Sequence, residues 1–505
     1  MAYEAFTISP PYQGIDLVSP IDNMAQEYAL ELTNVFPGPS APITRKGYSS
    51  YCDLSATQTS VNTLFPYSRQ NGTVDLIAVT AGTTRRIYKI TAGVATNITG
   101  STAISSTGTN MNCEQFGSRL YMCNGVDAVQ VYDGTTVADS TFTGVTLANL
   151  INVSAYKERL YFVEKNSMKF WYGNTQAVGS SALTSFDLQY VMKNGGYLLF
   201  AGSYTNQVAQ TSQDLFWAIS SEGEIVFYSG SSPASDAWGL VARYVIGKPL
   251  GFRAFVRVNN DVWILTQQGI IPISALFQSD PEQALNVVSA RINPFIAQAA
   301  KYFSFSPRWH GMFWPQGRRV FINIPNSESQ SKMAVYSIDT RGWCFYELAT
   351  ATDAITINVA DGIPYYGSST GRVFEAEDGF TDNGLPIHFA GRCAFSYFGT
   401  RGNFKAFKDI RPLLKANKGI TLGLGLDINF QETAIVDQVS TGVATTTPWG
   451  SLWGSPWSSE TEYIFNRYAT RGQGHSAAVR FSGAISNSEC QFYGFEIRFD
   501  VGGQV

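Results

Sequence analysis

Residues 118–136 read SRLYMCNGVDAVQVYDGTT, and residues 158–176 read ERLYFVEKNSMKFWYGNTQ. Five residues of the first stretch recur in the second at a common offset of about 40 positions. Chance would give about one identity in a window of this length. The recurring residues are Arg119, Leu120, Tyr121, Tyr132 and Thr135, which return as Arg159, Leu160, Tyr161, Tyr172 and Thr175. This period is typical of a four-stranded propeller blade or of a helical pair. In the sequence apolar and polar residues alternate, and Asn124-Gly125 and Asp133-Gly134 supply hairpin turns. The pattern therefore favours blades.

The same skeleton of an apolar strand, a polar turn and a second strand recurs along the chain. Its copies are marked by Leu76, Leu120, Leu160, Leu215, Val262, Val320 and Ile363. These marks predict an all-β propeller of about seven blades, with six or eight also possible, over residues 61–383.

Wide gaps between the marks indicate two insertions, after Leu160 and after Val262. We expect the second insertion, Asp280–Phe303, to be helical. Asp280 would be its N-cap, Pro281 would lie in the first turn, and Pro294 would break the helix.

The segments on either side of the predicted propeller differ from it. Residues 1–60 lack the hairpin rhythm and contain one candidate helix, DNMAQEYALEL from Asp22. We expect this extended segment to cross the body, supply a closing strand or reach a neighbouring subunit. After Gly384 longer strands alternate, such as GITLGLGLDINF, AAVRFSGAI and CQFYGFEIRFDV, which predicts a β-sandwich-like domain over residues 384–505.

Composition limits the classes of function. The chain has 505 residues, 15% charged and 14% aromatic, and a formal net charge of −4. This charge argues against a surface that holds nucleic acid by neutralising phosphates, although DNA could still slide past it. The six sparse cysteines, which form no C-x-x-C pair, predict reduced thiols. The first residues do not resemble a secretory signal, and no apolar run of about 18 residues predicts a membrane span.

A serine motif raises the question of catalysis. Residues 367–371, GSSTG, match the G-x-S-x-G nucleophile elbow, which needs a strand before Ser369 and a helix after it. The following RVFEA alternates like a strand, so we expect a hairpin turn. The three histidines, His310, His388 and His475, are far apart in sequence, and we expect neither a metal site nor a cofactor.

Two groups of residues are candidates for docking a partner. Trp449, Trp453 and Trp457 lie in a loop rich in Gly, Pro and Ser. Their indoles could cover the end of the sandwich or dock a partner or a sugar. The basic run that begins with Lys405, Lys408 and Arg411 could meet phosphate or an acidic partner, but a solvated strand face is the interpretation we favour.

Three stretches of the chain resemble a known family. They are IDNMAQEYALELTNVFPGPSAPITRKGYSSY (21–51), with an Asn followed later by Arg-x-Gly, YYGSSTGRVFEAEDGFTDNGLPI (365–387) and WGSLWGSPW (449–457). In these stretches the chain is similar to the tail nozzle (hub) proteins of short-tailed bacteriophages, also called packaged-DNA stabilisation proteins.

The resemblance implies a non-enzymatic propeller subunit repeated six-fold below the portal and adaptor rings of a virion. Such a homohexamer would form a tube in the tail that retains packaged double-stranded DNA, opens for ejection and carries fibres or tailspikes. It would assemble in the cytoplasm of the host bacterium. The alternative is a glycan-binding or glycan-degrading propeller that uses the tryptophan loop as a sugar platform.

Overall fold

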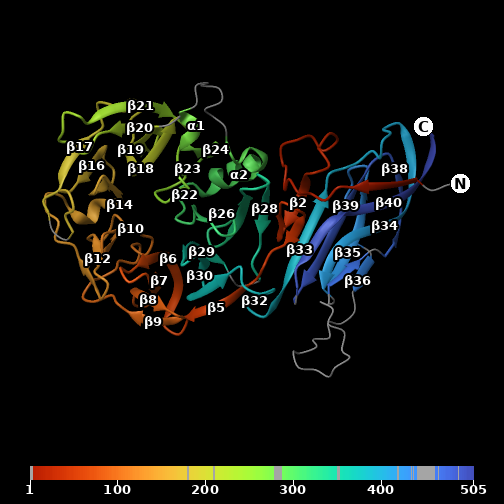
Figure 1. The fold of residues 1–505 in the computed structure, drawn as a ribbon, viewed down its shortest axis with the longest axis horizontal. Helices are drawn as coiled ribbons and strands as arrows, with labels where there is room; N and C mark the ends of the chain where they lie inside the picture. The colour runs from red at the N-terminus through yellow and green to blue at the C-terminus, as the bar shows by residue number, and fades with distance from the viewer. Residues whose placement is uncertain are drawn as a thin grey trace. The chain divides into compact units, whose positions relative to one another are not determined.

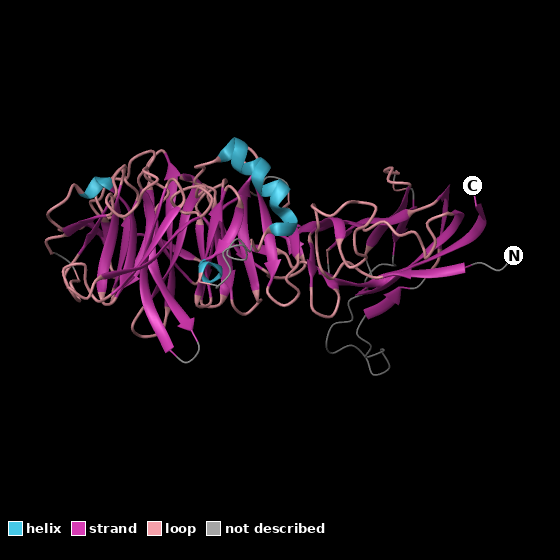
Figure 2. Ribbon diagram, turned by 90° about the horizontal axis from the view of Figure 1, so that it is seen from above, coloured by secondary structure: helices cyan, strands magenta, loops and turns pink. Residues whose placement is uncertain are grey.

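The computed structural model describes residues 4–178, 181–208, 211–277, 287–349, 353–417, 420–433, 435, 437–440, 461–464, 466–486 and 488–504. The chain divides into two compact units. One comprises residues 1–49, 332–350 and 376–505, and the other residues 50–331 and 351–375. Strands dominate both units, and helix is confined to a few short segments (Figure 2).

Five small antiparallel sheets and two segments of a larger sheet follow one another around a ring in the described part of the chain, and we number these seven sheets in chain order (Figure 1). The first three consist of β6 (Gln58–Ser68), β7 (Val74–Gly82), β8 (Arg86–Thr91) and β9 (Val94–Asn97); β10 (Asn112–Phe116), β11 (Arg119–Cys123), β12 (Gln130–Tyr132) and β13 (Val137–Asp139); and β14 (Leu150–Tyr156), β15 (Arg159–Glu164), β16 (Lys169–Tyr172) and β17 (Thr184–Asp187). The fourth and fifth consist of β18 (Leu198–Val208), β19 (Thr211–Ser220), β20 (Glu224–Ser229) and β21 (Gly239–Val245); and β22 (Phe255–Val258), β23 (Asp261–Thr266) and β24 (Gly269–Pro272). The sixth contains β25 (His310–Trp314) and β26 (Arg319–Pro325), and the seventh contains β29 (Ala354–Ala360), β30 (Ile363–Ser368) and β31 (Arg372–Ala376). Strands β27 (Ser331–Ser337) and β28 (Trp343–Tyr346), which follow in the chain after β26, belong almost entirely to the other compact unit.

This arrangement confirms the predicted β-propeller. Each of the seven marks read from the sequence falls on the second strand of a sheet, from Leu76 on β7 to Ile363 on β30. Innermost strands of successive sheets contact one another, for example β10 with β14, β22 with β25 and β25 with β29.

The repeated Leu-Tyr pair shows why the 40-residue pattern exists. Leu120 packs into the core between the first and second sheets, and Tyr121 into the core between the second and third. Leu160 and Tyr161 do the same one sheet further on. Successive side chains of a strand point to opposite faces, and both faces of a blade are covered by neighbours. An inner blade strand therefore needs apolar residues at adjacent positions.

The N-terminal segment closes the ring. Strand β5 (Tyr48–Asp53) lies beside β31 and adds a further strand to the seventh sheet. The backbone N–H of Leu54 donates to the carbonyl of Gly371 (3.0 Å), and Arg372 pairs with Asp53 (3.0 Å). The innermost strands of the seventh and first sheets, β29 and β6, contact each other. Of the three roles expected for this segment, the closing strand is the one that β5 performs.

The helical insertion after β24 differs from the prediction. Helix α1 (Ile273–Leu276) follows β24 directly, and helix α2 (Asn293–Phe303) begins where the sequence predicted a break. Pro294 lies in the first turn of α2, where a missing N–H costs no intrahelical hydrogen bond, so it begins the helix. Asp280 and Pro281 lie outside the described residues. Two short 3₁₀ segments, Leu147–Asn149 and Ala290–Ile292, complete the described helices.

The other unit contains a two-layered sandwich. One layer consists of β1 (Glu4–Ile8), β3 (Val35–Pro37), β4 (Pro42–Thr44), β34 (Asn403–Asn417), β37 (Thr461–Ile464), β38 (Tyr468–Gly474) and β40 (Cys490–Gln504). The other contains β2 (Ala29–Thr33), β32 (Thr381–Asp382), β33 (Leu385–Cys393), β35 (Thr421–Ile428), β36 (Asp437–Ser440) and β39 (Ala477–Ile485).

Aromatic rings join the two layers of this sandwich. Phe389 of β33 and Phe481 of β39 pack on Phe492 of β40, with ring centroids 5.8 and 4.8 Å apart. The three strands predicted from the alternating runs near the C-terminus, β35, β39 and β40, are confirmed.

The helix predicted from Asp22 is wrong. Residues 21–28 form turns and irregular backbone, and Ala29 then opens strand β2, where it pairs with Cys393 of β33. The helical spacing of a short segment is a weak preference, and pairing with a distant strand overrides it.

A buried ion pair organises the N-terminal strands within this unit. Arg45 Nη2 lies 2.6 Å from Asp382 Oδ2, and both side chains are 2% exposed. Arg45 Nε donates to Asn34 Oδ1 (2.8 Å), and Nη2 also donates to the carbonyl of Glu347 (2.8 Å). Asn34 and Arg45, the Asn and the Arg of the Arg-x-Gly in residues 21–51, are thus members of one hydrogen-bonded cluster.

Candidate functional site

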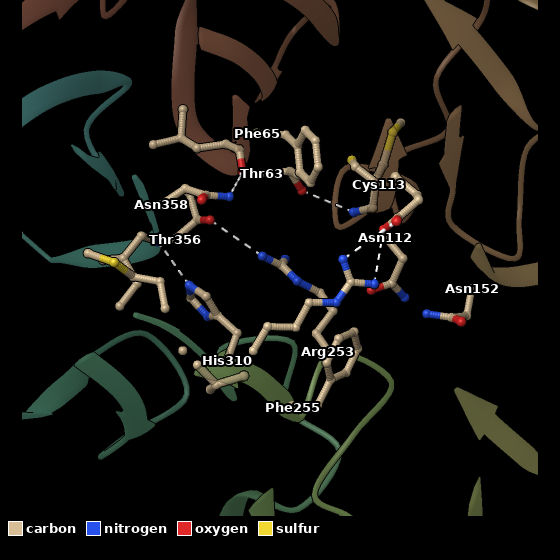
Figure 3. A pocket seen from close by; sticks show the side chains of 18 of the residues that line it. Thr63, Phe65, Asn112, Cys113, Asn152, Arg253, Phe255, His310, Thr356 and Asn358 are labelled. Carbon is tan, nitrogen blue, oxygen red and sulfur yellow. Dashed lines mark hydrogen bonds and ion pairs between the residues drawn. The ribbon is translucent and has the colours of Figure 1, made fainter. Parts of the chain in front are cut away.

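The candidate site is a cavity of about 260 Å³ within the propeller unit, lined by innermost strands (Figure 3). Six strands contribute side chains to its wall: β6, β10, β14, β22, β25 and β29. Because these strands run around the ring, the cavity occupies the propeller axis.

Arg253 crosses this axis. It precedes β22 of the fifth sheet, yet its Nη1 donates to the carbonyl of Asn62 in the first sheet (3.2 Å) and to Asn110 Oδ1 (3.3 Å). Its Nη2 donates to Thr356 Oγ1 of the seventh sheet (3.4 Å), as Figure 3 shows. One guanidinium therefore connects sheets on opposite sides of the ring.

Asn112 makes a second connection across the axis. Its side-chain amide, on β10 of the second sheet, donates to the carbonyl of Phe252 in the loop before β22 (3.1 Å) and to that of Ile151 (2.8 Å). Together with Arg253, this amide ties the fifth sheet to the first, second and seventh across the centre.

Other polar side chains near the axis join neighbouring sheets. Asn358 Nδ2 donates to the carbonyl of Leu64 (2.9 Å), and Asn152 Oδ1 accepts from the N–H of Ala201 (3.2 Å). Because a buried backbone group without a partner is costly, these amides stabilise the ring by satisfying backbone atoms at sheet boundaries.

His310 is a structural residue of this kind. Its Nε2 accepts from the N–H of Ile357 (2.9 Å), so its Nδ1 carries the proton and donates to the carbonyl of Arg308 (3.1 Å). Burial, together with the charge of Arg253, lowers the pKa of His310 to about 3. The imidazole is therefore neutral near pH 7, and both ring nitrogens are occupied.

The cavity is poorly suited to acid–base or nucleophilic chemistry at neutral pH. Burial raises the pKa of the Cys113 thiol to about 12, so little of the reactive thiolate is present. Glu114 is paired with Arg257, Oε2 to Nη2, at 3.1 Å. Burial lowers the pKa of Arg253 to about 10, a value at which the guanidinium is still charged. What this arrangement offers is a positive charge and polar hydrogen-bonding groups.

The docking residues predicted from the sequence lie elsewhere. Trp449, Trp453 and Trp457 fall outside the described residues. Lys405, Lys408 and Arg411 lie on β34 of the sandwich, not at the propeller axis.

The basic run on β34 is not the solvated face that the sequence favoured. Lys405 is fully buried, and its Nζ donates to the carbonyls of Thr400 (2.6 Å), Asn403 (3.0 Å) and His475 (3.1 Å). Because burial disfavours the charged amine, the pKa of Lys405 is lowered.

The exposed Lys408 and the half-buried Arg411 have acidic partners on β40. Lys408 pairs with Asp500 (3.1 Å), and Arg411 pairs with Glu496 (3.4 Å). Much of the positive charge available to a partner is therefore compensated within the sandwich.

Ser369 lies at the bend of the β30–β31 hairpin, as predicted. Gly367 pairs with Val373 on the facing strand, and Gly371 adopts a φ of 73°, in the left-handed region that glycine tolerates. A strand, not a helix, follows the serine, so the nucleophile-elbow geometry is not formed.

Neither a metal-ligand cluster nor a membrane-spanning helix is found among the described residues. In that part of the chain, no three His, Cys, Asp or Glu side chains are grouped as metal ligands would be. The helices described there include none long and apolar enough to cross a membrane.

Sequence reasoning missed the axial residues Arg253, Asn112 and Asn152. They belong to no sequence motif, and whether their side chains come close in space depends on the angle between successive sheets of the ring. For Asn112 and Asn152 a usable signal was a polar residue on the first strand of a repeat, where both faces should otherwise be apolar; Arg253, which lies before β22, offered no such signal.

Neither a comparison with protein-family profiles nor one with curated protein sequences returns a match for this chain. Among solved structures, similarity is found to a catalytically inactive virginiamycin B lyase from Staphylococcus aureus crystallised with quinupristin. The identity is 10%, covering 63% of this chain and 95% of that one, with a TM-score of 0.40. The computationally designed Ika8 protein is similar at 10% identity over 65% of this chain and 99% of its own, with a TM-score of 0.37.

Proposed function

We propose that the chain is a structural subunit of the tail nozzle of a short-tailed bacteriophage. Six copies would form a ring-shaped channel below the portal and adaptor of the virion. The ring would retain packaged double-stranded DNA, open for ejection and offer attachment to fibres or tailspikes. The proposal takes its family from the resemblance of residues 21–51, 365–387 and 449–457.

One observation of the fold carries the proposal furthest: the propeller axis is used to hold the ring together. Arg253 and Asn112 bind across it, and Asn358 and His310 each bind one backbone group of the adjoining sheet. A propeller whose sheets are joined by hydrogen bonds across its axis is better suited to be a rigid structural subunit than a catalyst.

The same observation bears on the route that DNA would take. The axial cavity, of about 260 Å³, is too small for a DNA duplex, because the major groove of the duplex is by itself already about 12 Å wide. Any channel for DNA must therefore be formed between copies of the chain. With a net charge of −4, such a channel would offer few counterion-releasing contacts, so DNA could pass without sticking.

The test is negative-stain electron microscopy of the purified full chain, alone and mixed with the products of the neighbouring genes, among which the proposal expects the adaptor protein. Rings of six copies, formed alone or only on the adaptor, are expected. The matched variant is Trp453→Ala, which should leave ring formation unchanged if the tryptophan loop serves only as a cover.

The contrary result would be a chain that stays monomeric beside its adaptor. If that monomer also bound glycans saturably, released sugar from them, or lost either property in Trp453→Ala, the glycan-directed alternative would replace the nozzle.

A further inference from the structure

The charge of Arg253 is not neutralised by the protein. Its three hydrogen bonds go to a carbonyl, an amide oxygen and a hydroxyl, at 3.2, 3.3 and 3.4 Å. Ordinary N–H···O bonds are about 2.9–3.0 Å long, and charge-assisted ones are shorter. Within the described residues, no ion pair joins this guanidinium to a carboxylate. Arg253 is half-buried, and a charge withdrawn from water in this way is normally paired, so this guanidinium is suited to receive an anion.

A second donor faces the same cavity. Asn152 is 1% exposed, and its Oδ1 is fixed by the N–H of Ala201, which identifies the other atom of the amide as the nitrogen. Figure 3 shows this nitrogen on the cavity side, and in the described chain it donates to no protein acceptor. The residue is buried, but this NH₂ group opens onto the cavity, so its two N–H donors are available to a bound group.

The remaining groups in the wall leave a net positive charge. Arg257 and Glu114 offset each other, His310 is neutral, and the Cys113 thiol is protonated. Only Arg253 is left over. The cavity is thus cationic inside a chain whose net charge is −4.

We propose that the axial cavity binds one small oxyanion, a phosphate or a carboxylate group, with Arg253 and Asn152 as its donors. The three hydrogen bonds of Arg253 use both N–H groups of Nη1 and one of Nη2, so the Nε–H and the second N–H of Nη2 remain to donate to oxygens of either anion. At about 260 Å³ the cavity has room for the group and a few waters, each of which needs about 30 Å³. This site is independent of the nozzle proposal, and either can fail without the other.

Isothermal titration of the full chain at low ionic strength tests the site with inorganic phosphate, with acetate and with neutral acetamide. Saturable binding of one phosphate or one acetate per chain, and no binding of acetamide, is expected. Phosphate alone would identify a phosphoryl group as the ligand, and acetate alone would identify a carboxylate, such as an acidic side chain of a partner. Failure of both anions to bind would overturn the proposal.

Arg253→Gln should weaken binding of the anion about tenfold to a hundredfold, the loss expected for a charge-assisted hydrogen bond. Lys157→Gln is the matched control, because it removes one positive charge from an exposed pair with Asp214 and should leave binding unchanged. Equal weakening in both variants would mean that anion binding depends on the overall charge of the chain and not on Arg253 in particular, and the site would be refuted.

A measurement on the unaltered chain covers the case in which Arg253→Gln does not fold. Phenylglyoxal modifies arginines, and peptide mapping follows each one separately. The anion should slow modification of Arg253 strongly and that of the exposed Arg372 little. An unchanged rate at Arg253 in the presence of phosphate and acetate would contradict the inference.

Discussion

Replacing Arg45 by Met should be among the most destabilising single changes in the sandwich unit. Asp382 would keep its charge in a site where it is 2% exposed, with the N–H of Ala349 (3.0 Å) still donating to it. Breaking a buried ion pair in this way costs about 3–5 kcal/mol, because the remaining charge is uncompensated. The hydrogen bonds that Arg45 gives to Asn34 and Glu347 are lost with it and are included in that figure, since such effects are not additive.

The loss can be measured by urea unfolding. For a slope of about 2 kcal/mol per molar urea, a loss of about 4 kcal/mol lowers the midpoint by about 2 M. Because the chain has two units and need not unfold in one step, the transition should be followed by hydrogen exchange of peptides from β4 and β33.

Two further variants decide whether the reasoning is right. Arg45→Met combined with Asp382→Leu removes both charges and should recover most of the loss. Lys408→Gln breaks an exposed pair in the same unit and should cost no more than about 1 kcal/mol. A double variant as unstable as the single one, or a loss below about 1 kcal/mol in Arg45→Met, would refute the ion-pair explanation.

Three other predictions concern stability. The pKa of His310 is about 3 in the folded chain and about 6.5 in the unfolded chain. The free energy of unfolding should therefore fall as pH drops below about 6.5, by about 2 kcal/mol at pH 5. Thermal melts of His310→Gln should lack this pH dependence. Burial raises the pKa of Asp409, but hydrogen bonds from Arg498 (2.9 and 3.0 Å) and other groups outweigh it and leave the pKa below its usual value. Its stabilisation is therefore present above about pH 4 and lost as pH falls through the lowered pKa, and Asp409→Asn should flatten acid unfolding followed by circular dichroism in that range. Gly47→Ala should lower the urea midpoint, because the added Cβ would overlap the backbone carbonyl of Thr381; an unchanged midpoint would show that this turn can move.

The fold could be predicted wherever a residue's role repeats. Leu120 and Leu160 occupy equivalent places in successive sheets, so one internal comparison located the blades, and the marks at Leu215 and Ile363 extended it. The Gly367–Gly371 turn was predictable for a similar reason, because alternation on both sides of a glycine-flanked bend depends on local geometry alone.

Errors arose where a distant strand decides the local structure. The segment from Asp22 has helical spacing, but Ala29 gains more by pairing with Cys393 than an isolated turn of helix can offer. Lys405 looked exposed because lysine usually is, and only the carbonyls of Thr400, Asn403 and His475 make its burial tolerable.

The candidate site could not be predicted at all. Arg253 precedes the inner strand of the fifth sheet, and its acceptors Asn62 and Thr356 lie in the first and seventh sheets. No sequence period relates these positions. Their distance is set by the number of sheets and the angle between them, which emerge only when the ring is closed.

Strand β5 has a consequence for how the chain is made. Residues 48–53 emerge from the ribosome early, but their neighbours on β31 are roughly 300 residues further along the chain. At 5–20 residues per second, the gap corresponds to roughly 15–60 s of translation, during which β5 has no native place in the propeller. The seventh sheet can then form only after nearly the whole propeller has been synthesised, so nascent chains should present unpaired strand edges that a chaperone or a passing copy could bind.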